Sequence, residues 1–121
     1  MKTKIDKMTR LAYRRTYDAT PKGQAERLRY QLKKRYGISV AAYQQLLAQQ
    51  NGVCAICREP GRTASRGNRL CVDHDHKTGR VRSLLCGHCN SAIGSLRESP
   101  LLARAAATYL EQQLAKELTG E

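Results

Sequence analysis

Two Cys-x-x-Cys pairs constrain this chain more than any other feature of its sequence. The first pair is Cys54 and Cys57, the second is Cys86 and Cys89, and residues 58–85 separate them. Each pair can direct two sulfurs at one point, and two pairs complete the four tetrahedral ligands that zinc accepts. The pattern therefore predicts one structural Zn²⁺ per chain, and the long interval predicts an independent structural element between the pairs.

Two other chemistries also use paired cysteines. Disulfides are typical of exported proteins, but residues 1–18 carry charges throughout and lack the apolar segment of a signal peptide. A redox dithiol needs only one pair, and neither pair lies in the βαβ pattern of a thioredoxin-like protein. We therefore expect a metal site in a compartment that keeps thiols reduced. The fifth cysteine, Cys71, is left over, either as an inert strand residue or as an oxidation-sensitive thiol.

A second cluster of chemically active side chains lies between the cysteine pairs. Asp73, His74, Asp75 and His76 follow one another, and Asn90 comes directly after the fourth cysteine. A carboxylate is a hard oxygen ligand of the kind that Mg²⁺ or Mn²⁺ prefers, and an imidazole titrates near neutral pH. Asn90 can add a neutral oxygen ligand. These residues predict a second metal site with a base beside it.

The elements around this cluster follow from the residue pattern. Residues 70–75 and 80–84 are expected to form two strands joined by a tight turn, and residues 87–97 to form a helix. Val81 and Leu84 are expected to be poorly buried. The hairpin would then depend on metal rather than on a core.

Two strands and a helix that carry such groups resemble the HNH, or ββα-metal, nuclease motif. More narrowly, Asp-His-Asp-His-Lys-Thr-Gly-Arg-Val-Arg followed by Leu-Leu-Cys-x-x-Cys-Asn is similar to the phage recombination endonuclease VII family. The resemblance extends over residues 43–96, roughly the middle half of the chain. It implies a small α+β fold, in which N-terminal and C-terminal helices flank a zinc-stabilised ββα-metal core.

The resemblance also implies a role for each residue of the cluster. Asp73 and Asn90 would bind a catalytic Mg²⁺ or Mn²⁺ at the scissile phosphate, and His74 would take a proton from the attacking water. His76 would contact phosphate or help to place the metal, unless it is only a structural hydrogen bonder. The implied function is hydrolysis of phosphodiester bonds in DNA, by nicking or by cutting branched DNA. A phage-encoded enzyme of this kind would work in the cytoplasm of its bacterial host.

Several positions depart from the family pattern or receive no role. Ser83 stands where glycine is common, and Ser91 and Ile93 occupy a helical turn where some members carry an acidic residue. Water or phosphate would therefore complete the shell of the catalytic metal. Asp75 either orients a histidine or is solvated, and His88 has no counterpart in the pattern.

Positive charge is concentrated in the N-terminal third of the chain. The chain has a formal charge of +12, and residues 1–36 hold 12 Lys or Arg against 3 acids. Such an excess favours nucleic acid as the partner, and no segment has the apolar face that membrane binding would need. A helix is expected over residues 21–36, between a Thr20 cap and Gly37. Its basic residues are expected to follow phosphates, unless they form only a solvated face. The predicted DNA contacts are Arg29, Lys33, Lys34, Arg35, Arg80 and Arg82.

We expect one domain with three parts: a basic helical arm (1–36), the nuclease core (37–97) and a C-terminal helix (98–121). Residues 1–19 form a further short helix or are frayed. The C-terminal helix carries an apolar stripe, expected to pack on the core or on a partner in a homodimer. The stripe consists of Leu102, Ala106, Leu110, Leu114 and Leu118.

A second class of function is a zinc-stabilised nucleic-acid-binding module without catalysis. Asp73, His74 and Asn90 distinguish the two classes, because a binding module has no reason to combine two metal ligands with a base. One chain carries one hydrolytic site, so symmetrical cleavage of a four-way junction would require a dimer. Nicking a duplex requires only one site.

Overall fold

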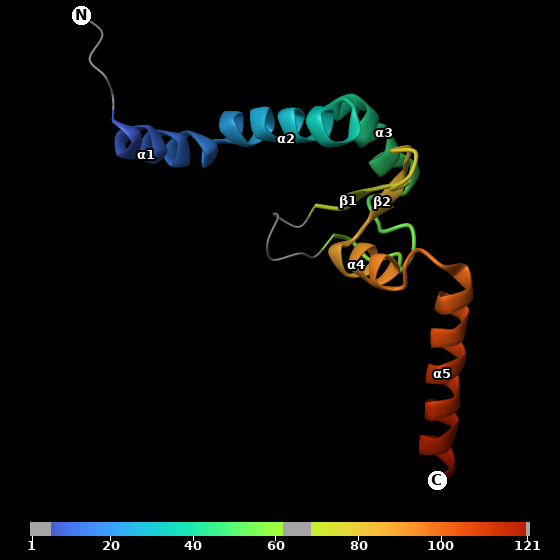
Figure 1. Cartoon of the computed structure of the whole chain (residues 1–121). Helices are drawn as coiled ribbons and strands as arrows, with labels where there is room; N and C mark the ends of the chain where they lie inside the picture. The colour runs from blue at the N-terminus through green and yellow to red at the C-terminus, as the bar shows by residue number, and fades with distance from the viewer. Residues whose placement is uncertain (1–5, 62–68, 121) are drawn as a thin grey trace, which may run out of the picture.

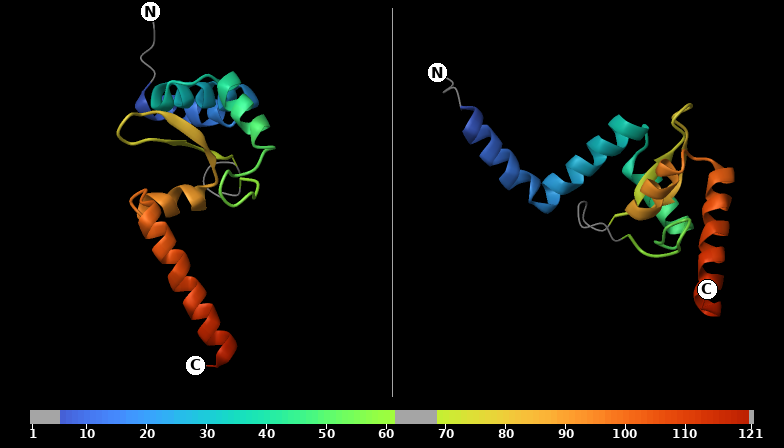
Figure 2. Two further views of the ribbon diagram at one scale, coloured as in Figure 1. Left: turned by 90° about the vertical axis from the view of Figure 1, so that its right-hand side faces the viewer. Right: turned by 60° about the horizontal axis from the view of Figure 1, so that its bottom comes forward.

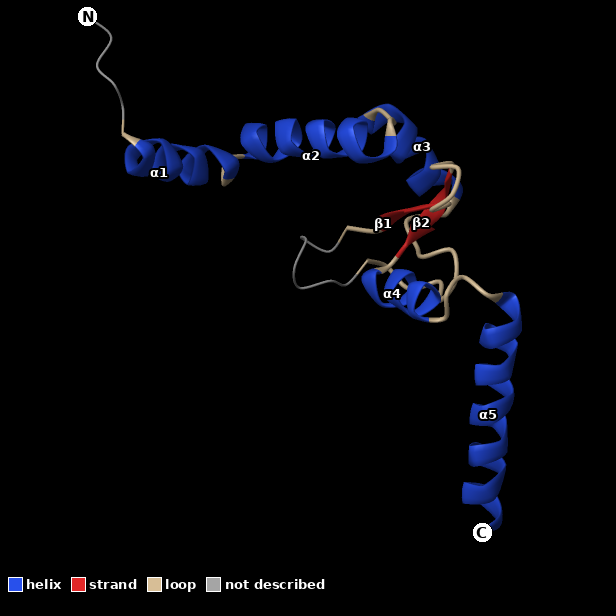
Figure 3. Ribbon diagram, viewed as in Figure 1, coloured by secondary structure: helices blue, strands red, loops and turns tan. Residues whose placement is uncertain are grey.

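The computed structural model describes residues 6–61 and 69–120, and within them the chain forms five helices and one antiparallel pair of strands. Figure 1 shows a small centre built from α3, α4 and the two strands, with one helical arm on each side. Figure 3 marks the same elements by type. The α+β class is therefore confirmed. The elements are α1 Lys7–Asp18, α2 Pro21–Tyr36, α3 Val40–Gln49, β1 Cys71–His74, β2 Val81–Leu85, α4 Gly87–Ser95 and α5 Pro100–Thr119.

Local capping signals set the helix boundaries. The side chains of Thr20, Ser39 and Ser99 accept hydrogen bonds from backbone N–H groups in the first turns of α2, α3 and α5. At the other end of α2, Gly37 has a left-handed φ of 69°, which glycine adopts without steric cost. The predicted limits of α2 are confirmed, and residues 7–18 form a helix rather than a frayed segment.

The core lies between the strands, α2 and α3. Leu84 is completely buried, so the expectation that it buries poorly is wrong, whereas Val81 is half-buried. Leu84 is covered because β2 lies against α3 and the first cysteine turn, where the Ala55 N–H donates to the Leu84 carbonyl at 3.1 Å. The buried apolar residues are Leu32, Tyr43, Cys54, Leu70, Val72, Leu84, Leu85 and Cys86.

The Gln50 side chain at the end of α3 makes hydrogen bonds to the backbone of β2 of the kind that a third strand would make. The Gln50 Oε1 accepts from the Leu84 N–H at 2.8 Å, and its Nε2 donates to the carbonyls of Leu84 and Val53, each at 2.9 Å. Two turns back along the helix, the Tyr43 hydroxyl donates to the Leu70 carbonyl at 2.8 Å. Helix α3 therefore fastens both strands by polar contacts as well as by packing, which keeps buried backbone groups hydrogen-bonded.

Helix α2 belongs to the core as well as to the basic arm. Leu32 is buried in the core, and Leu28 and Tyr36 pack against it from the same helix face. The basic residues of α2 lie on its exposed sides. Packing therefore continues across the boundary expected at residue 36, and removing residues 1–36 would also remove part of the core. Residues 1–5 of the expected arm lie outside the described residues.

Helix α5 projects away from the rest of the described chain (Figure 2, left). Leu110, Leu114 and Leu118 are 59%, 58% and 90% exposed, and Leu102 is 41% exposed. The expectation that the stripe packs on the chain's own core is therefore not met in the structure. Packing on a second copy stays a prediction. None of the helices in the described residues is both long and apolar enough to cross a membrane.

Leu84→Ala should lower the free energy of unfolding by about 2–5 kcal/mol, because it leaves a cavity in a core with few other large side chains. Urea unfolding of the zinc-loaded protein measures this. Leu101→Ala is the matched control, since the same side chain is removed from a position that is 72% exposed and lies outside the apolar stripe of α5, and it should cost less than about 0.5 kcal/mol. Equal destabilisation by the two variants would show that the core is not where the structure places it.

Candidate active site and metal centre

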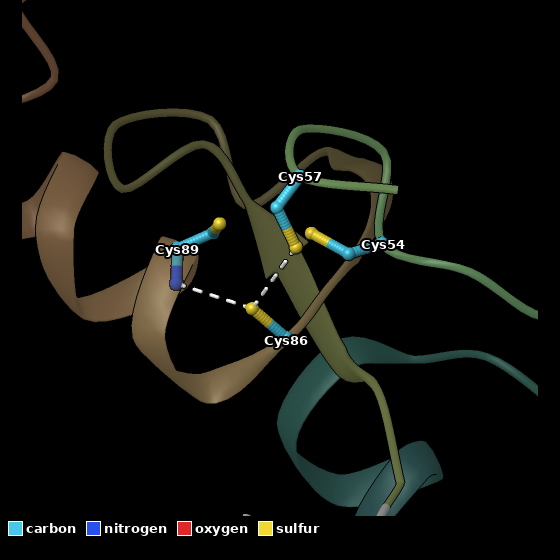
Figure 4. Close-up of side chains that lie close together, drawn as sticks. All are labelled: Cys54, Cys57, Cys86 and Cys89. Atoms are coloured by element: carbon cyan, nitrogen blue, oxygen red, sulfur yellow. Dashed lines mark hydrogen bonds between the residues drawn. The ribbon is translucent and has the colours of Figure 1, made fainter. Parts of the chain in front are cut away.

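Four cysteine sulfurs converge beside the strands. Cys54, Cys57, Cys86 and Cys89 each offer a sulfur within 4.8 Å of the others (Figure 4). The Cys57 and Cys86 sulfurs are 3.8 Å apart, far beyond the ~2.05 Å of a disulfide bond. Two ligands of a tetrahedral zinc with Zn–S bonds of ~2.3 Å would lie roughly 3.8 Å apart. The arrangement therefore fits a four-cysteine zinc site and not a pair of disulfides.

The backbone around these cysteines favours thiolates. The Ile56 N–H donates to the Cys54 sulfur, and the Cys89 N–H donates to the Cys86 sulfur, each at 3.4 Å. Burial opposes ionisation of Cys54, yet backbone hydrogen bonds bring the pKa of this thiol down to about 6. Burial and the neighbouring thiols raise the pKa of Cys89 to about 12. The backbone hydrogen bonds thus favour the thiolate form of Cys54. All four thiols can ionise together only if a cation such as Zn²⁺ balances their negative charge.

The two strands contain a β-bulge at the cluster of Asp73 and His74. Asp73 pairs with Ser83, but the next residue, His74, pairs with Val81, so Arg82 is an extra residue in β2. An extra residue of this kind bends its strand and redirects side chains, and bulges are common beside active sites. The bulge lies where the expected catalytic residues follow one another in β1.

Arg82 holds the buried carboxylate of Asp73 from two directions. Its Nε donates to Oδ2 at 2.7 Å and its Nη2 donates to Oδ1 at 2.9 Å, while Asp73 is only 7% exposed. The hydrogen bonds and charge of Asp73 raise the pKa of Arg82. A carboxylate has about four lone-pair positions, so each oxygen keeps one for a further partner. Asp73 is therefore fixed in orientation and can still serve as an oxygen ligand for Mg²⁺ or Mn²⁺.

Glu98 joins the site from the turn between α4 and α5. Its Oε1 accepts from the Arg82 Nη2 at 3.0 Å and lies 3.3 Å from the Nε2 of His76. A continuous chain of polar groups thus runs from Asp73 through Arg82 and Glu98 to His76. The sequence reasoning missed Glu98 because it sought an acidic residue within the motif helix. The available signal was that Glu98 is the first acidic residue after Asp75.

The two histidine rings of the cluster lie together. The His74 ring is 4.8 Å from the His76 ring and 5.4 Å from the Tyr36 ring, measured between centroids. His74 is half-buried, whereas the His76 side chain is 68% exposed. The last turn of α2 therefore forms one wall beside His74, and His76 forms the other.

Asn90 lies in the first turn of α4, next to the metal centre. It is half-buried, and its backbone N–H donates to the Cys86 carbonyl at 3.0 Å. Helix α4 contacts both β1 and β2. The four-cysteine centre thus fixes the start of the helix that carries Asn90 against the strand that carries Asp73.

The remaining predicted residues lie at the edge of the site. Asp75 accepts from the backbone N–H groups of Lys77 and Thr78 at 2.8 and 2.9 Å, which lowers the pKa of its carboxyl group and shapes the turn between the strands. Its role is therefore structural. Arg80 is exposed beside this turn. The basic residues expected to meet phosphate on α2 are also exposed: Arg29, Lys33, Lys34 and Arg35.

Cys86→Ala should bind zinc more weakly and lose the structure of the chain's centre, because the core is too small to persist without its metal. Zinc content by atomic emission and the dispersion of backbone amide resonances measure both effects. Cys71→Ala is the matched control, since Cys71 is a cysteine outside the cluster and should leave one zinc per chain. Native dispersion in metal-free Cys86→Ala protein would rule out a structural zinc here.

Comparison with known proteins gives one family. The model of the family described as recombination endonuclease VII matches residues 29–112. The Gene 59 proteins of Mycobacterium phages D29 and L5 are each 41% identical over 87 residues, which is 71% of this chain and 51% of each relative. The chain thus spans about half the length of these relatives. Because the family match runs from α2 into α5 and includes both cysteine pairs and the strand pair, the chain belongs to the recombination endonuclease VII family.

Proposed function

We propose that this chain is a metal-dependent endonuclease of HNH type that hydrolyses phosphodiester bonds in DNA. The observation that carries the proposal is the pair Asp73 and His74, which are adjacent in β1, a strand that α4 contacts. Arg82 fixes the carboxylate, and His76 flanks the imidazole. Membership of the recombination endonuclease VII family supports it. The net charge of +12 favours a polyanionic substrate.

Asp73 and Asn90 are the proposed ligands of a catalytic Mg²⁺ or Mn²⁺. Both offer oxygen, the donor that these ions prefer, and the zinc centre holds the elements that carry them. When bound, the ion would stabilise the negative charge that develops on the scissile phosphate and the leaving oxygen. No further protein ligand is needed if water and phosphate complete the shell.

His74 is the proposed general base. Its ring is half-buried between Tyr36 and His76, so its direction is restricted while part of it stays open to substrate. Imidazole is the side chain that most often serves as a general acid or base in enzymes. Its neighbour in the chain, Asp73, would keep the base within reach of the phosphate-bound ion.

Arg82 and Glu98 would position the groups around the reacting phosphate. Arg82 uses Nε and Nη2 in its bonds to Asp73 and Glu98, and the two N–H groups of Nη1 take no part in these three bonds. They can meet a phosphate oxygen without breaking the chain of contacts. Glu98 would hold both Arg82 and His76 in place.

The form of the DNA substrate is a further part of the proposal. A single chain can nick one strand of a duplex. Symmetrical cleavage of branched DNA requires two copies, and the exposed stripe of α5 is the proposed dimer seam. Rates on four-way junction, nicked and linear duplex DNA would show which form is preferred.

The rival function is a zinc-stabilised module that binds nucleic acid without cutting it. In that case Asp73 and Arg82 would be an ordinary buried ion pair, and His74 would have no chemical role. Incubation of supercoiled plasmid with Mg²⁺ or Mn²⁺ decides between the two. Nicking that a metal-free buffer abolishes supports the nuclease, and no nicking at any metal concentration supports the binding module.

His74→Ala should lower the single-turnover rate of plasmid nicking by about 10²–10⁴-fold, with zinc content and DNA affinity unchanged. His88→Ala is the matched control, because His88 is exposed and lies outside the cluster. Asp73→Asn and Asn90→Ala should instead weaken the catalytic ion, so added Mn²⁺ should restore part of their activity. If added metal alone restored the full nicking rate of His74→Ala, His74 would not be the general base.

Replacing Arg29, Lys33 and Lys34 together by Gln should weaken DNA binding and make it less dependent on salt. The slope of log affinity against log salt should fall by roughly 0.9 for each phosphate that the variant no longer neutralises. These side chains are exposed, so the core residue Leu32 is left intact. The control replaces Arg104 and Lys116 on α5 by Gln. An unchanged slope in the α2 variant would show that its basic face is only solvated.

A further inference from the structure

Helices α1 and α2 meet at a sharp elbow and enclose a groove. Figure 2 (right) shows the two helices as the arms of a V. The groove has a volume of about 1330 Å³ and is lined from both helices, well away from the four-cysteine centre. None of its lining residues belongs to the proposed catalytic cluster.

The elbow is built by specific contacts and is not a loose joint. The Thr20 hydroxyl donates to the Tyr17 carbonyl at 2.6 Å and accepts from the Gly23 N–H at 3.0 Å. Gly23 is buried, and a Cβ added there would lie 2.0 Å from the Tyr17 carbonyl oxygen. Only glycine therefore allows α2 to approach the end of α1 this closely. The Glu26 carboxylate of α2 reaches the Tyr17 side chain, which raises the pKa of that phenol.

The lining of the groove is strongly basic. Seven of its residues are Lys or Arg and two are acidic, so its ligand should be an anion. The two arms contribute the positive charge together, from Arg10 and Arg14 on α1 and from Arg27, Arg29 and Lys34 on α2. A long groove with cations on both walls suits a chain of phosphates better than a single small anion.

Tyrosine rings stand among these cations. Tyr13 and Tyr30 are 72% and 62% exposed, although large aromatic side chains gain more from burial. The Tyr13 ring lies nearly parallel to the Tyr17 ring, with planes 9° apart and centroids 6.3 Å apart. The Lys34 ammonium lies 5.3 Å from the centroid of Tyr30 and 3.0 Å from its hydroxyl. Exposed rings interleaved with cations are what single-stranded nucleic acid binds, because its bases can stack.

We propose that the groove between α1 and α2 binds an unpaired DNA strand, with Tyr13 and Tyr30 stacking on bases and the surrounding cations contacting phosphates. A duplex would use the cations but not the rings, because its bases are covered. The choice of DNA rests on the proposed nuclease function. The choice of an unpaired strand rests on the rings and the charge of the groove.

The groove has a neighbour on the side of α2 that faces the strands. Gln31 and Arg35 line both the groove and a small cleft that α2 forms with residues 69–72. Along the axis of α2, Tyr30 lies about 9 Å before Tyr36, which packs beside His74. That distance is roughly the rise of three stacked nucleotides. Six residues of an α-helix also turn the side chain by about 120°, so a strand seated on Tyr30 would pass partly around α2 to reach the proposed catalytic cluster. This path favours DNA in which an unpaired segment lies close to the cut.

Fluorescence anisotropy of labelled oligothymidylate and of a blunt duplex of equal length, in buffer without Mg²⁺ or Mn²⁺, tests the proposal. Tyr13→Ala/Tyr30→Ala should weaken binding of the single strand by at least about tenfold and binding of the duplex by less than about twofold. Tyr109→Ala is the matched control, since Tyr109 is 61% exposed on α5 and should change neither affinity. Equal weakening for both DNAs, unchanged affinity for both, or tighter binding of oligouridylate than of oligothymidylate would overturn the proposal.

Gly23→Ala tests the elbow without changing any charge or ring in the groove. The added methyl group must displace the backbone at Tyr17, so the arms should open and single-strand affinity should fall while one zinc per chain remains. Unchanged affinity would show that the shape of the groove is not used.

Plasmid nicking by the same proteins separates the two proposals. If the tyrosines are needed for single-strand binding but the protein does not nick plasmid, the proposed groove is supported and the proposed nuclease function is contradicted. If the protein nicks plasmid but Tyr13→Ala/Tyr30→Ala leaves single-strand affinity unchanged, the nuclease function is supported and the proposed groove is contradicted.

Discussion

Convergence of four sulfurs on one point is the constraint on which the rest of this structure depends. The described chain buries only eight apolar residues, and two of them, Cys54 and Cys86, belong to the sulfur cluster. One cysteine pair precedes the strands and the other follows them, so a metal bound there ties the two ends of the hairpin segment together. Zinc contributes about 10–16 kcal/mol in small peptides, which is enough to stabilise so small a core. The position of the proposed catalytic cluster in the hairpin depends on this connection.

The buried carboxylate of Asp73 depends on a second constraint. A carboxylate that is 7% exposed needs compensating charge, and Arg82 provides it through two hydrogen bonds. Glu98 then balances the guanidinium and reaches His76. Each group in this series of contacts restricts the orientation of the next one. The same contacts that orient Asp73 therefore also restrict His76, which lies against His74. In the proposed function, this order lets a small hairpin present a metal ligand, a base and a phosphate contact on one surface.

The features that the sequence predicts well are those with local causes. Thr20 stands directly at the helix start that it caps, and the cysteine pairs carry their geometry in their spacing. Contacts between distant segments could not be read in this way. Leu84 is buried because Gln50, 34 residues earlier, fastens β2 to α3, and Glu98 meets the site through a turn whose path no local pattern fixes. Periodicity marked the apolar stripe of α5 but could not say what covers it.

The most direct test of the account is anomalous diffraction from crystals grown with Mn²⁺, with data collected on either side of the zinc and manganese absorption edges. We expect a zinc peak among Cys54, Cys57, Cys86 and Cys89, and a separate manganese peak in contact with Asp73 and Asn90. We also expect the hydrogen bonds between Arg82 and Asp73 to persist. A zinc peak with manganese bound elsewhere would contradict the proposed catalytic site, and no metal among the four sulfurs would contradict the account as a whole.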